Sequence, residues 1–141
     1  MSAYDPAAHA WRAMPGAPLP GGLGVPWAKK VDSHWRYGLL TDSVHANPYG
    51  IVHGGILATF ADHALSLIAW EAAKRALCTT IQLNIHFLDA VKPGEFIELH
   101  GEVTRRTNAL VFLRGKIVVS NHDRVRDVGG VDGIWRVSQS G

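Results

Sequence analysis

The fold of this chain is decided by the stretch Asn47-Pro48-Tyr49-Gly50-Ile51-Val52-His53-Gly54-Gly55 and by the apolar run that follows it. A turn rich in Asn, Pro and Gly ahead of helical periodicity predicts that His53, Gly54 and Gly55 stand at a helix N-terminus. Backbone N–H groups at that end lack intrahelical partners and carry partial positive charge, so they can bind a polarised carbonyl. Asp62, nine residues after His53, adds a carboxylate two turns further on. Amides that bind an electrophile close to a base make a minimal acyl-transfer site.

The segment from Gly54 to Arg75 is predicted to be one long helix with two different faces. At 100° per residue, one face gathers bulky apolar residues that must be buried: Ile56, Leu57, Phe60, Ala64, Leu67 and Ile68. The opposite face gathers residues that are small or polar: Gly55, Ala58, Thr59, Asp62, Ser66 and Ala69. We expect the bulky face to pack on the chain's own sheet and the small face to meet something that approaches closely.

Strand-like runs flank this helix. Trp35–Leu40 precedes it, and four runs follow it at Thr79–Asp89, Phe96–Arg105, Leu110–Val119 and Arg124–Val137. The first of these alternates, with Ile81, Leu83, Ile85 and Phe87 on one face and Thr80, Gln82, Asn84 and His86 on the other. Short turns, at Lys92–Glu95 and at Asn121-His122-Asp123, favour an antiparallel meander, and Gly129-Gly130 predicts a bulge or bend. The expected class is therefore α+β, with a sheet of about five strands curled around one helix.

Residues 1–33 are expected to form an N-terminal wrapping segment ahead of a single domain at residues 34–141. Ala7–Met14 is predicted to be a short helix that exposes Trp11 on one side, and Pro15–Pro26 to be an irregular connection. Trp11 and Trp27 are candidate anchors on the fold or on a partner subunit.

Composition narrows the class of protein. The chain of 141 residues is long enough for one hydrophobic core, and its charged fraction of 18% is low enough to suggest that another subunit covers part of the surface. A net charge of +2 does not indicate a nucleic-acid partner. The lone Cys78 suits a reducing compartment and a structural thiol, and the N-terminus lacks the features of a signal peptide. The longest apolar stretch, Ile56–Trp70, is too short to span a bilayer, so we expect a cytoplasmic protein with no membrane contact.

The pattern Asn-x-x-Gly-x-x-His-Gly-Gly, with an Asp nine positions past the His, resembles the signature of hotdog-fold acyl-CoA thioesterases of the PaaI-like group. The likeness extends from Trp35 to Val137 and implies an antiparallel sheet wrapped around a central helix. It also implies a homo-oligomer with shared active sites, at minimum a dimer built through a continuous sheet. A tetramer is plausible if the polar strand faces at Gln82, Asn84 and His86 meet a second dimer.

The resemblance also implies roles for particular residues. Asp62 would be the general base that activates water or the nucleophile that forms an anhydride, and the Gly54 N–H would bind the thioester oxygen. Asn47 would either donate to the same carbonyl or order its own loop, and His53 would be a positioning residue. Thr80 matches the residue that holds the attacking water, although a shift of one residue would exchange it with Thr79.

The substrate implied by the resemblance is an acyl-CoA, held by a close approach to Gly55 and by basic side chains that meet the CoA phosphates. Arg105 and Arg106, at a strand end, are the candidates for that contact. His45, His63, His86 and His100 do not have the spacing of a zinc site, and no cofactor is expected. Two alternatives to hydrolysis remain open: a non-catalytic acyl-CoA-binding module and, ranked lower, a hydroxyacyl-thioester dehydratase.

Overall fold

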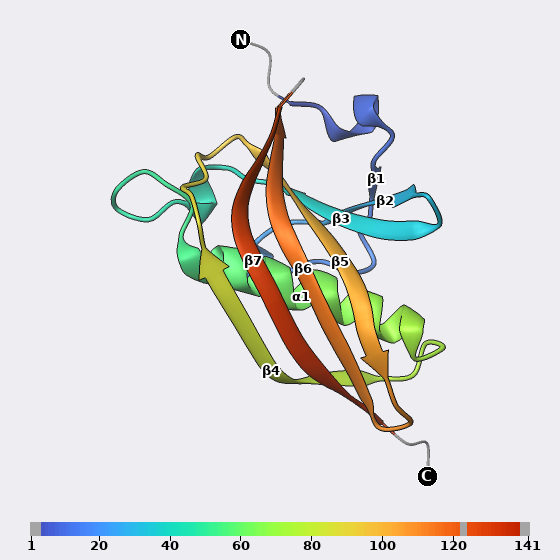
Figure 1. Ribbon diagram of the computed structural model, residues 1–141. Helices are drawn as coiled ribbons and strands as arrows, with labels where there is room; N and C mark the ends of the chain where they lie inside the picture. Colours follow the sequence, from blue (N-terminus) through green and yellow to red (C-terminus); the bar gives the residue numbers. More distant parts are fainter. Residues whose placement is uncertain (1–3, 122–123, 139–141) are drawn as a thin grey trace.

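The computed structural model describes residues 4–121 and 124–138, and its main body is a curved antiparallel sheet of seven strands laid over a single long helix (Figure 1). The helix is α1 (Gly54–Ala72). The strands are β1 (Arg12–Ala13), β2 (Trp27–Val31), β3 (His34–Leu40), β4 (Cys78–Phe87), β5 (Phe96–Arg106), β6 (Leu110–Asn121) and β7 (Arg124–Val137). His122 and Asp123, in the turn expected between the last two strands, lie outside the described residues.

Helix α1 begins at Gly54, as predicted, and buries one face against the sheet. Its fully buried residues are Leu57, Phe60, Ala61, Ala64, Leu65 and Ala69. Ile56 and Leu67, expected in this stripe, are only partly buried, so the buried face is centred nearer Ala61 and Leu65 than predicted. The helix ends at Ala72 rather than at Arg75, because Lys74 and Arg75 adopt the left-handed backbone conformation that terminates helices.

The order of strands in the sheet is β1-β2-β3-β5-β6-β7-β4. Strands β5, β6 and β7 form the expected meander, but β4 pairs with β7 and not with β5. The prediction of a simple meander is therefore wrong for β4. The connection at residues 88–95 does end in a local turn, but it leads from β4 past β7 and β6 to β5. The sheet has seven strands rather than about five because residues of the N-terminal segment supply β1 and β2.

A β-bulge in β4 changes which side chains face the helix. Thr80 pairs with Trp135 and Gln82 pairs with Ile134, which leaves Ile81 as the extra residue. Thr80 therefore lies on the helix side, and the predicted face assignment of Thr80 and Ile81 is wrong. The bend expected at Gly129-Gly130 is present beside Gly129, where the pairing of β7 with β6 skips Val128.

The N-terminal segment packs on the outer face of the sheet through aromatic rings. The rings of Tyr4 and Trp11 each lie 5.0 Å from that of Phe96 on β5. Gly38 on β3 makes room for this cluster, since a Cβ atom there would lie within 2.1 Å of the Phe96 ring. Trp11 is only 4% exposed, so the prediction that it is exposed is wrong.

The segment then crosses to the helix. The predicted helix at Ala7–Met14 is wrong: a 3-10 turn, Pro6–His9, ends where Ala10 adopts a left-handed φ of 69°, and β1 follows. The irregular stretch after β1 buries Leu19 in the core and places the Ala17 carbonyl 2.8 Å from His63 Nε2 on α1. Strand β2 then adds the segment to the edge of the sheet beside β3.

Replacement of Trp11 by Ala is expected to lower the free energy of unfolding by about 3 kcal/mol, because it empties an aromatic site that its neighbours fill only partly. Urea unfolding followed by circular dichroism measures the change. Tyr49→Ala is the control, since Tyr49 is 89% exposed and its loss should change stability little. Equal stability of the two variants would show that the N-terminal segment does not stabilise the domain.

Candidate active site

The N-terminus of α1 presents one free amide. His53 caps the helix, and its Nδ1 atom accepts a hydrogen bond of 2.8 Å from the Gly55 N–H. The Gly55 N–H is therefore already bonded within the protein. The predicted contact of Gly55 with substrate then rests on its lack of a side chain, which permits a close approach to the backbone. The Gly54 N–H has no hydrogen-bond partner among the residues that the structure describes. Gly54 is thus the donor that an incoming carbonyl oxygen can reach.

A cavity of about 310 Å³ lies beside Gly54. Its walls are mainly apolar and come from the loop before α1, from α1 itself and from the end of β4 with the connection that follows it: Asn47, Ile51, Val52, Gly54, Leu57, Phe87, Leu88, Asp89, Ala90 and Val91. A Cβ atom at Gly54 would lie 3.3 Å from the Phe87 ring, so a larger residue would crowd the space between this amide and that ring. Such a cavity suits an apolar group attached to a polar carbonyl.

Asn47 orders the loop that leads to the helix. Its Oδ1 atom accepts hydrogen bonds from the backbone N–H groups of Tyr49 (2.9 Å) and Ile51 (3.3 Å). Its own N–H donates to the Ile51 carbonyl at 2.7 Å. The loop-ordering role weighed from the sequence is therefore visible in the geometry. Asn47 also lines the cavity beside Gly54.

Asp62 is half-buried and meets Thr80, not Thr79. The Thr80 hydroxyl donates a hydrogen bond of 2.6 Å to Asp62 Oδ1. The bulge at Ile81 makes this contact possible, because it keeps Thr80 on the helix side together with Leu83 and Ile85 further along β4. A carboxylate and a hydroxyl at this distance can hold one water molecule between them and a substrate.

The two halves of the predicted site lie apart within one chain. Gly54 and Asp62 are eight residues apart on the same helix, which is about 12 Å at a rise of 1.5 Å per residue. A thioester carbonyl bound at Gly54 is therefore out of reach of the Asp62 carboxylate of the same chain. Either a second copy supplies the carboxylate, or only one of these groups acts.

Strand β4 offers an edge to which a second copy can bind. It is last in the sheet and pairs only with β7 among the described strands. Ile81 is 53% exposed and Phe87 is 55% exposed along this edge. An unpaired edge with exposed apolar side chains is a place where another strand can add.

Arg105 and Arg106 lie far from the cavity of their own chain. Both are exposed near the end of β5, and Arg106 Nε donates to the Ala72 carbonyl at 3.5 Å, at the C-terminal end of α1. Gly54 is at the other end of this helix, roughly 27 Å away at 1.5 Å per residue. These arginines therefore do not line the cavity at Gly54.

His45 was considered in the sequence only as a metal ligand, yet it has a clear structural place. Its ring is buried, with Nδ1 accepting from the Asp42 N–H at 2.9 Å and Nε2 lying 2.6 Å from the Leu23 carbonyl. Its carbonyl accepts the N–H of His53 at 2.8 Å. His45 thus fixes the residue that caps α1, and no periodicity in the sequence could have indicated this.

Other candidate chemistries gain no support from the described residues. These residues contain no group of three His, Cys, Asp or Glu side chains arranged to hold a metal ion. Cys78 is half-buried, and burial raises the pKa of its thiol, so it is a poor nucleophile. Within the described part of the chain, no helix has both the length and the apolar character needed to cross a membrane.

Comparison with known proteins identifies the family. The family model of the thioesterase superfamily matches residues 49–125, more than half of the chain, and the chain belongs to this superfamily. The matched region contains the start of α1, Asp62 and Thr80. No curated protein matches the sequence significantly.

Solved structures confirm the hotdog fold. A Bacillus halodurans protein in a structure with CoA matches with a TM-score of 0.70 and 22% identity, over 81% of this chain and 74% of that one. A hypothetical thioesterase of Streptococcus pneumoniae with coenzyme A matches with a TM-score of 0.66 and 22% identity, over 80% of this chain and 85% of that one. The Escherichia coli PaaI protein from the phenylacetic acid degradation operon matches with a TM-score of 0.65 and 13% identity, over 95% of this chain and 83% of that one. The expected family and fold are therefore confirmed.

Removal of the Thr80 hydroxyl is expected to affect stability more than the same change at its neighbour. Thr80→Val keeps the shape of the side chain but removes the donor to Asp62, and should lower the free energy of unfolding by about 1 kcal/mol. Thr79→Val is the matched control, because Thr79 is exposed on the other face of β4. Urea unfolding of both variants makes the comparison, and an equal effect would contradict the contact between Thr80 and Asp62.

Proposed function

We propose that this protein hydrolyses an acyl-CoA thioester to a free carboxylic acid and CoA. The observation that carries the proposal is the Asp62 carboxylate, hydrogen-bonded by Thr80, on the same helix that begins with the free Gly54 amide. Membership of the thioesterase superfamily supports the thioester as the bond that reacts. The coenzyme A in two structures of similar fold supports CoA as the thiol.

The first role in this mechanism belongs to Gly54. The thioester carbonyl oxygen accepts a hydrogen bond from the Gly54 N–H, and it gains negative charge as the tetrahedral intermediate forms. A donor fixed at the end of a helix stabilises that charge more than it stabilises the neutral substrate. Loss of one such donor typically costs about 3 kcal/mol of transition-state stabilisation. Asn47, on the wall of the same cavity, is the candidate for a second donor.

Asp62 promotes the attack on the carbonyl carbon by one of two routes. As a general base it takes a proton from water while the water oxygen bonds to the carbonyl carbon, and the C–S bond then breaks to release the CoA thiolate. As a nucleophile it bonds to that carbon itself, expels the thiolate, and forms an anhydride that water cleaves. Thr80 orients the water in the first route, and His53 positions the helix terminus in both.

The active site is shared between two copies of the chain. The distance of about 12 Å between Gly54 and Asp62 along one helix supports this arrangement, because the Asp62 carboxylate of the same chain is too far from a carbonyl bound at Gly54. Pairing of β4 with β4 of a second copy would continue the sheet and bring the two helices side by side near the half-buried Ala58, Thr59 and Asp62. Each dimer would then have two sites, and the polar faces at Gln82, Asn84 and His86 remain the candidate contacts for a tetramer.

The nucleotide part of CoA is assigned to Arg105 and Arg106 of the subunit that contributes Asp62. Asp62 and Ala72, which accepts a hydrogen bond from Arg106, are ten residues apart on α1, or about 15 Å. That length suits a substrate whose phosphates lie far from its thioester. The fork of an arginine side chain matches phosphate oxygens.

Asp62→Asn tests the chemistry. The substitution keeps the size of the side chain but removes its charge and basicity, so kcat should fall by about 100-fold or more while KM changes little. Release of free thiol from a panel of acyl-CoAs measures both constants. Asp32→Asn is the matched control: Asp32 is exposed in a turn at a φ of 49°, which Asn tolerates.

Full turnover by Asp62→Asn, with fold and assembly intact, would overturn the catalytic role. Binding of acyl-CoA without thiol release by the wild-type protein would instead identify a binding module. Hydrolysis by the active enzyme in ¹⁸O-labelled water separates the two routes, because label in the Asp62 carboxylate requires an anhydride.

Assembly provides the second test. Light scattering should give the wild-type protein at least twice the mass of the chain. Ile81→Lys adds a charge to the open edge of β4, and it should yield a monomer at micromolar concentration that has lost activity. Val125→Lys, at a position on β7 that is 64% exposed, is the control. An active monomer would contradict the shared site.

A further inference from the structure

The connection between β4 and β5 forms one wall of the cavity beside Gly54. Its residues Leu88, Asp89, Ala90 and Val91 line the cavity. The Leu88 N–H donates to the Val128 carbonyl of β7 at 2.9 Å. At the other end of the wall, the Val91 carbonyl accepts the Val52 N–H at 2.8 Å. The wall is therefore attached on one side to the sheet and on the other to the residues that lead into α1.

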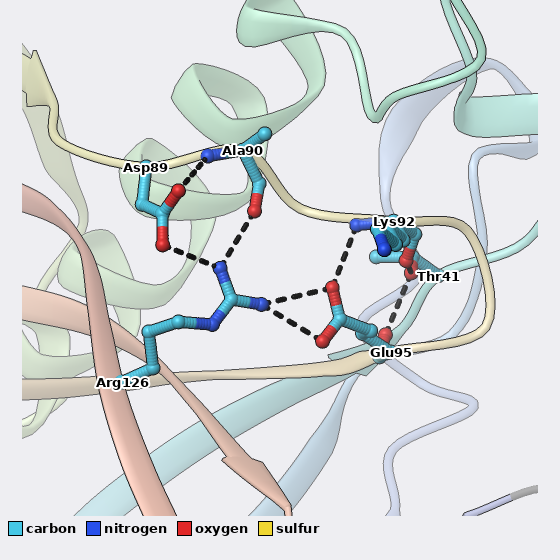
Figure 2. Close-up of polar contacts among 6 residues, drawn as sticks. All are labelled: Thr41, Asp89, Ala90, Lys92, Glu95 and Arg126. Atoms are coloured by element: carbon cyan, nitrogen blue, oxygen red, sulfur yellow. Dashed lines mark hydrogen bonds and ion pairs between the residues drawn. The ribbon is translucent and has the colours of Figure 1, made fainter.

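One side chain, Arg126 of β7, holds this wall at several points (Figure 2). Its Nη1 donates to Asp89 Oδ2 at 2.8 Å and to the Ala90 carbonyl at 2.7 Å. Its Nη2 donates to both carboxylate oxygens of Glu95, at 3.0 and 2.8 Å. A single guanidinium thus joins the first half of the connection to its last residue.

Glu95 passes the restraint on to the rest of the turn. Its Oε1 atom accepts the Lys92 N–H at 2.7 Å, and its carbonyl accepts the hydroxyl of Thr41 at 2.6 Å. Thr41 is buried at the end of β3 and also lies 3.3 Å from the Lys92 carbonyl. The connection is therefore held by a network of polar contacts that converges on Arg126.

The charges in this network stabilise one another over the physiological pH range. The hydrogen bond from Arg126, together with one from the Ala90 N–H, lowers the pKa of Asp89, so this carboxylate stays ionised. The hydrogen bond to Asp89 raises the pKa of Arg126; burial opposes this rise, and the hydrogen bond and charge of Glu95 add to it. A lysine would keep the charge but lacks the planar fork that reaches acceptor atoms of three residues at once.

We propose that Arg126 is a positioning residue for the oxyanion site: it fixes the Leu88–Val91 wall, and the wall fixes the Gly54 amide. The inference rests on the proposed function of Gly54 as the oxyanion donor. The path is short, since Arg126 binds Ala90, the next residue binds Val52, and Val52 stands two residues before Gly54. Phe87, whose ring borders Gly54, directly precedes the same wall.

The expected effect of losing this contact is on the chemical step. A catalytic donor displaced by about 1 Å can cost up to 100-fold in rate, although the substrate still binds. Arg126→Gln and Arg126→Lys should each lower kcat by about tenfold or more and change KM by less than about threefold. Arg124→Gln, an exposed arginine on the same strand, should leave both constants unchanged. Both Arg126 variants should keep the wild-type oligomeric state.

Hydrogen exchange measured by mass spectrometry gives a readout that does not depend on activity. Peptides that cover residues 51–57 and 88–95 should exchange faster in Arg126→Gln than in the wild-type protein, because both segments lose their common restraint. Peptides from the centre of β6 should be unchanged. Arg124→Gln should exchange like the wild-type protein throughout. If Arg126→Gln does not fold, Arg126→Lys provides the same measurements with the charge retained.

The outcomes separate this inference from the proposed function. Wild-type kcat in the Arg126 variants, or unchanged exchange at residues 51–57, would overturn the positioning role even if the enzyme is an active thioesterase. Faster exchange at residues 51–57 in a protein that hydrolyses no acyl-CoA would support the path from Arg126 to Gly54 and overturn the proposed function instead. Reduced kcat, unchanged KM and faster exchange together would support both.

Discussion

The burial of α1 by a curved sheet is the constraint on which the rest of the structure depends. Among the described residues α1 is the single α-helix, so its wide apolar face is buried by a sheet that curls around it. The sheet approaches closely at Gly101, where a Cβ atom would lie 2.8 Å from Ile68 on the helix. Two residues before Ile68, the Ser66 hydroxyl accepts a hydrogen bond of 2.8 Å from the indole N–H of Trp135, a fully buried residue of β7. These contacts fix the rotation of the helix about its axis and therefore the direction in which Asp62 points.

Under the proposed function, the same arrangement leaves the active site incomplete in a single chain. One helix carries both the free Gly54 amide and the Asp62 carboxylate, and its rigidity keeps them about 12 Å apart. The strand that meets Asp62, β4, is also an edge strand of the sheet. The position of the candidate base and the position of the exposed edge therefore point to the same solution, in which a second copy completes the sheet and the site together.

Elements outside α1 keep the candidate site in place. His45 fixes the capping residue from one side, through its carbonyl bond to His53. Arg126 fixes the opposite wall of the cavity through the connection between β4 and β5. The N-terminal segment covers the outer face of the sheet with Tyr4 and Trp11 and then supplies two strands. A small cavity beside one amide is thus supported by contacts from most of the chain.

The sequence by itself determined the features that depend on neighbouring residues. The start of the helix at Gly54, five of the seven strands and the family follow from turn chemistry, from periodicity and from one spaced pattern. Only the tertiary structure decided which strand lies beside which. Pairing of β4 with β7 and the bulge at Ile81 depend on contacts across the sheet, and this bulge is what turns Thr80 toward Asp62. The burial of Trp11 and the network around Arg126 were hidden for the same reason: side chains distant in the sequence meet only once the sheet has closed over the helix.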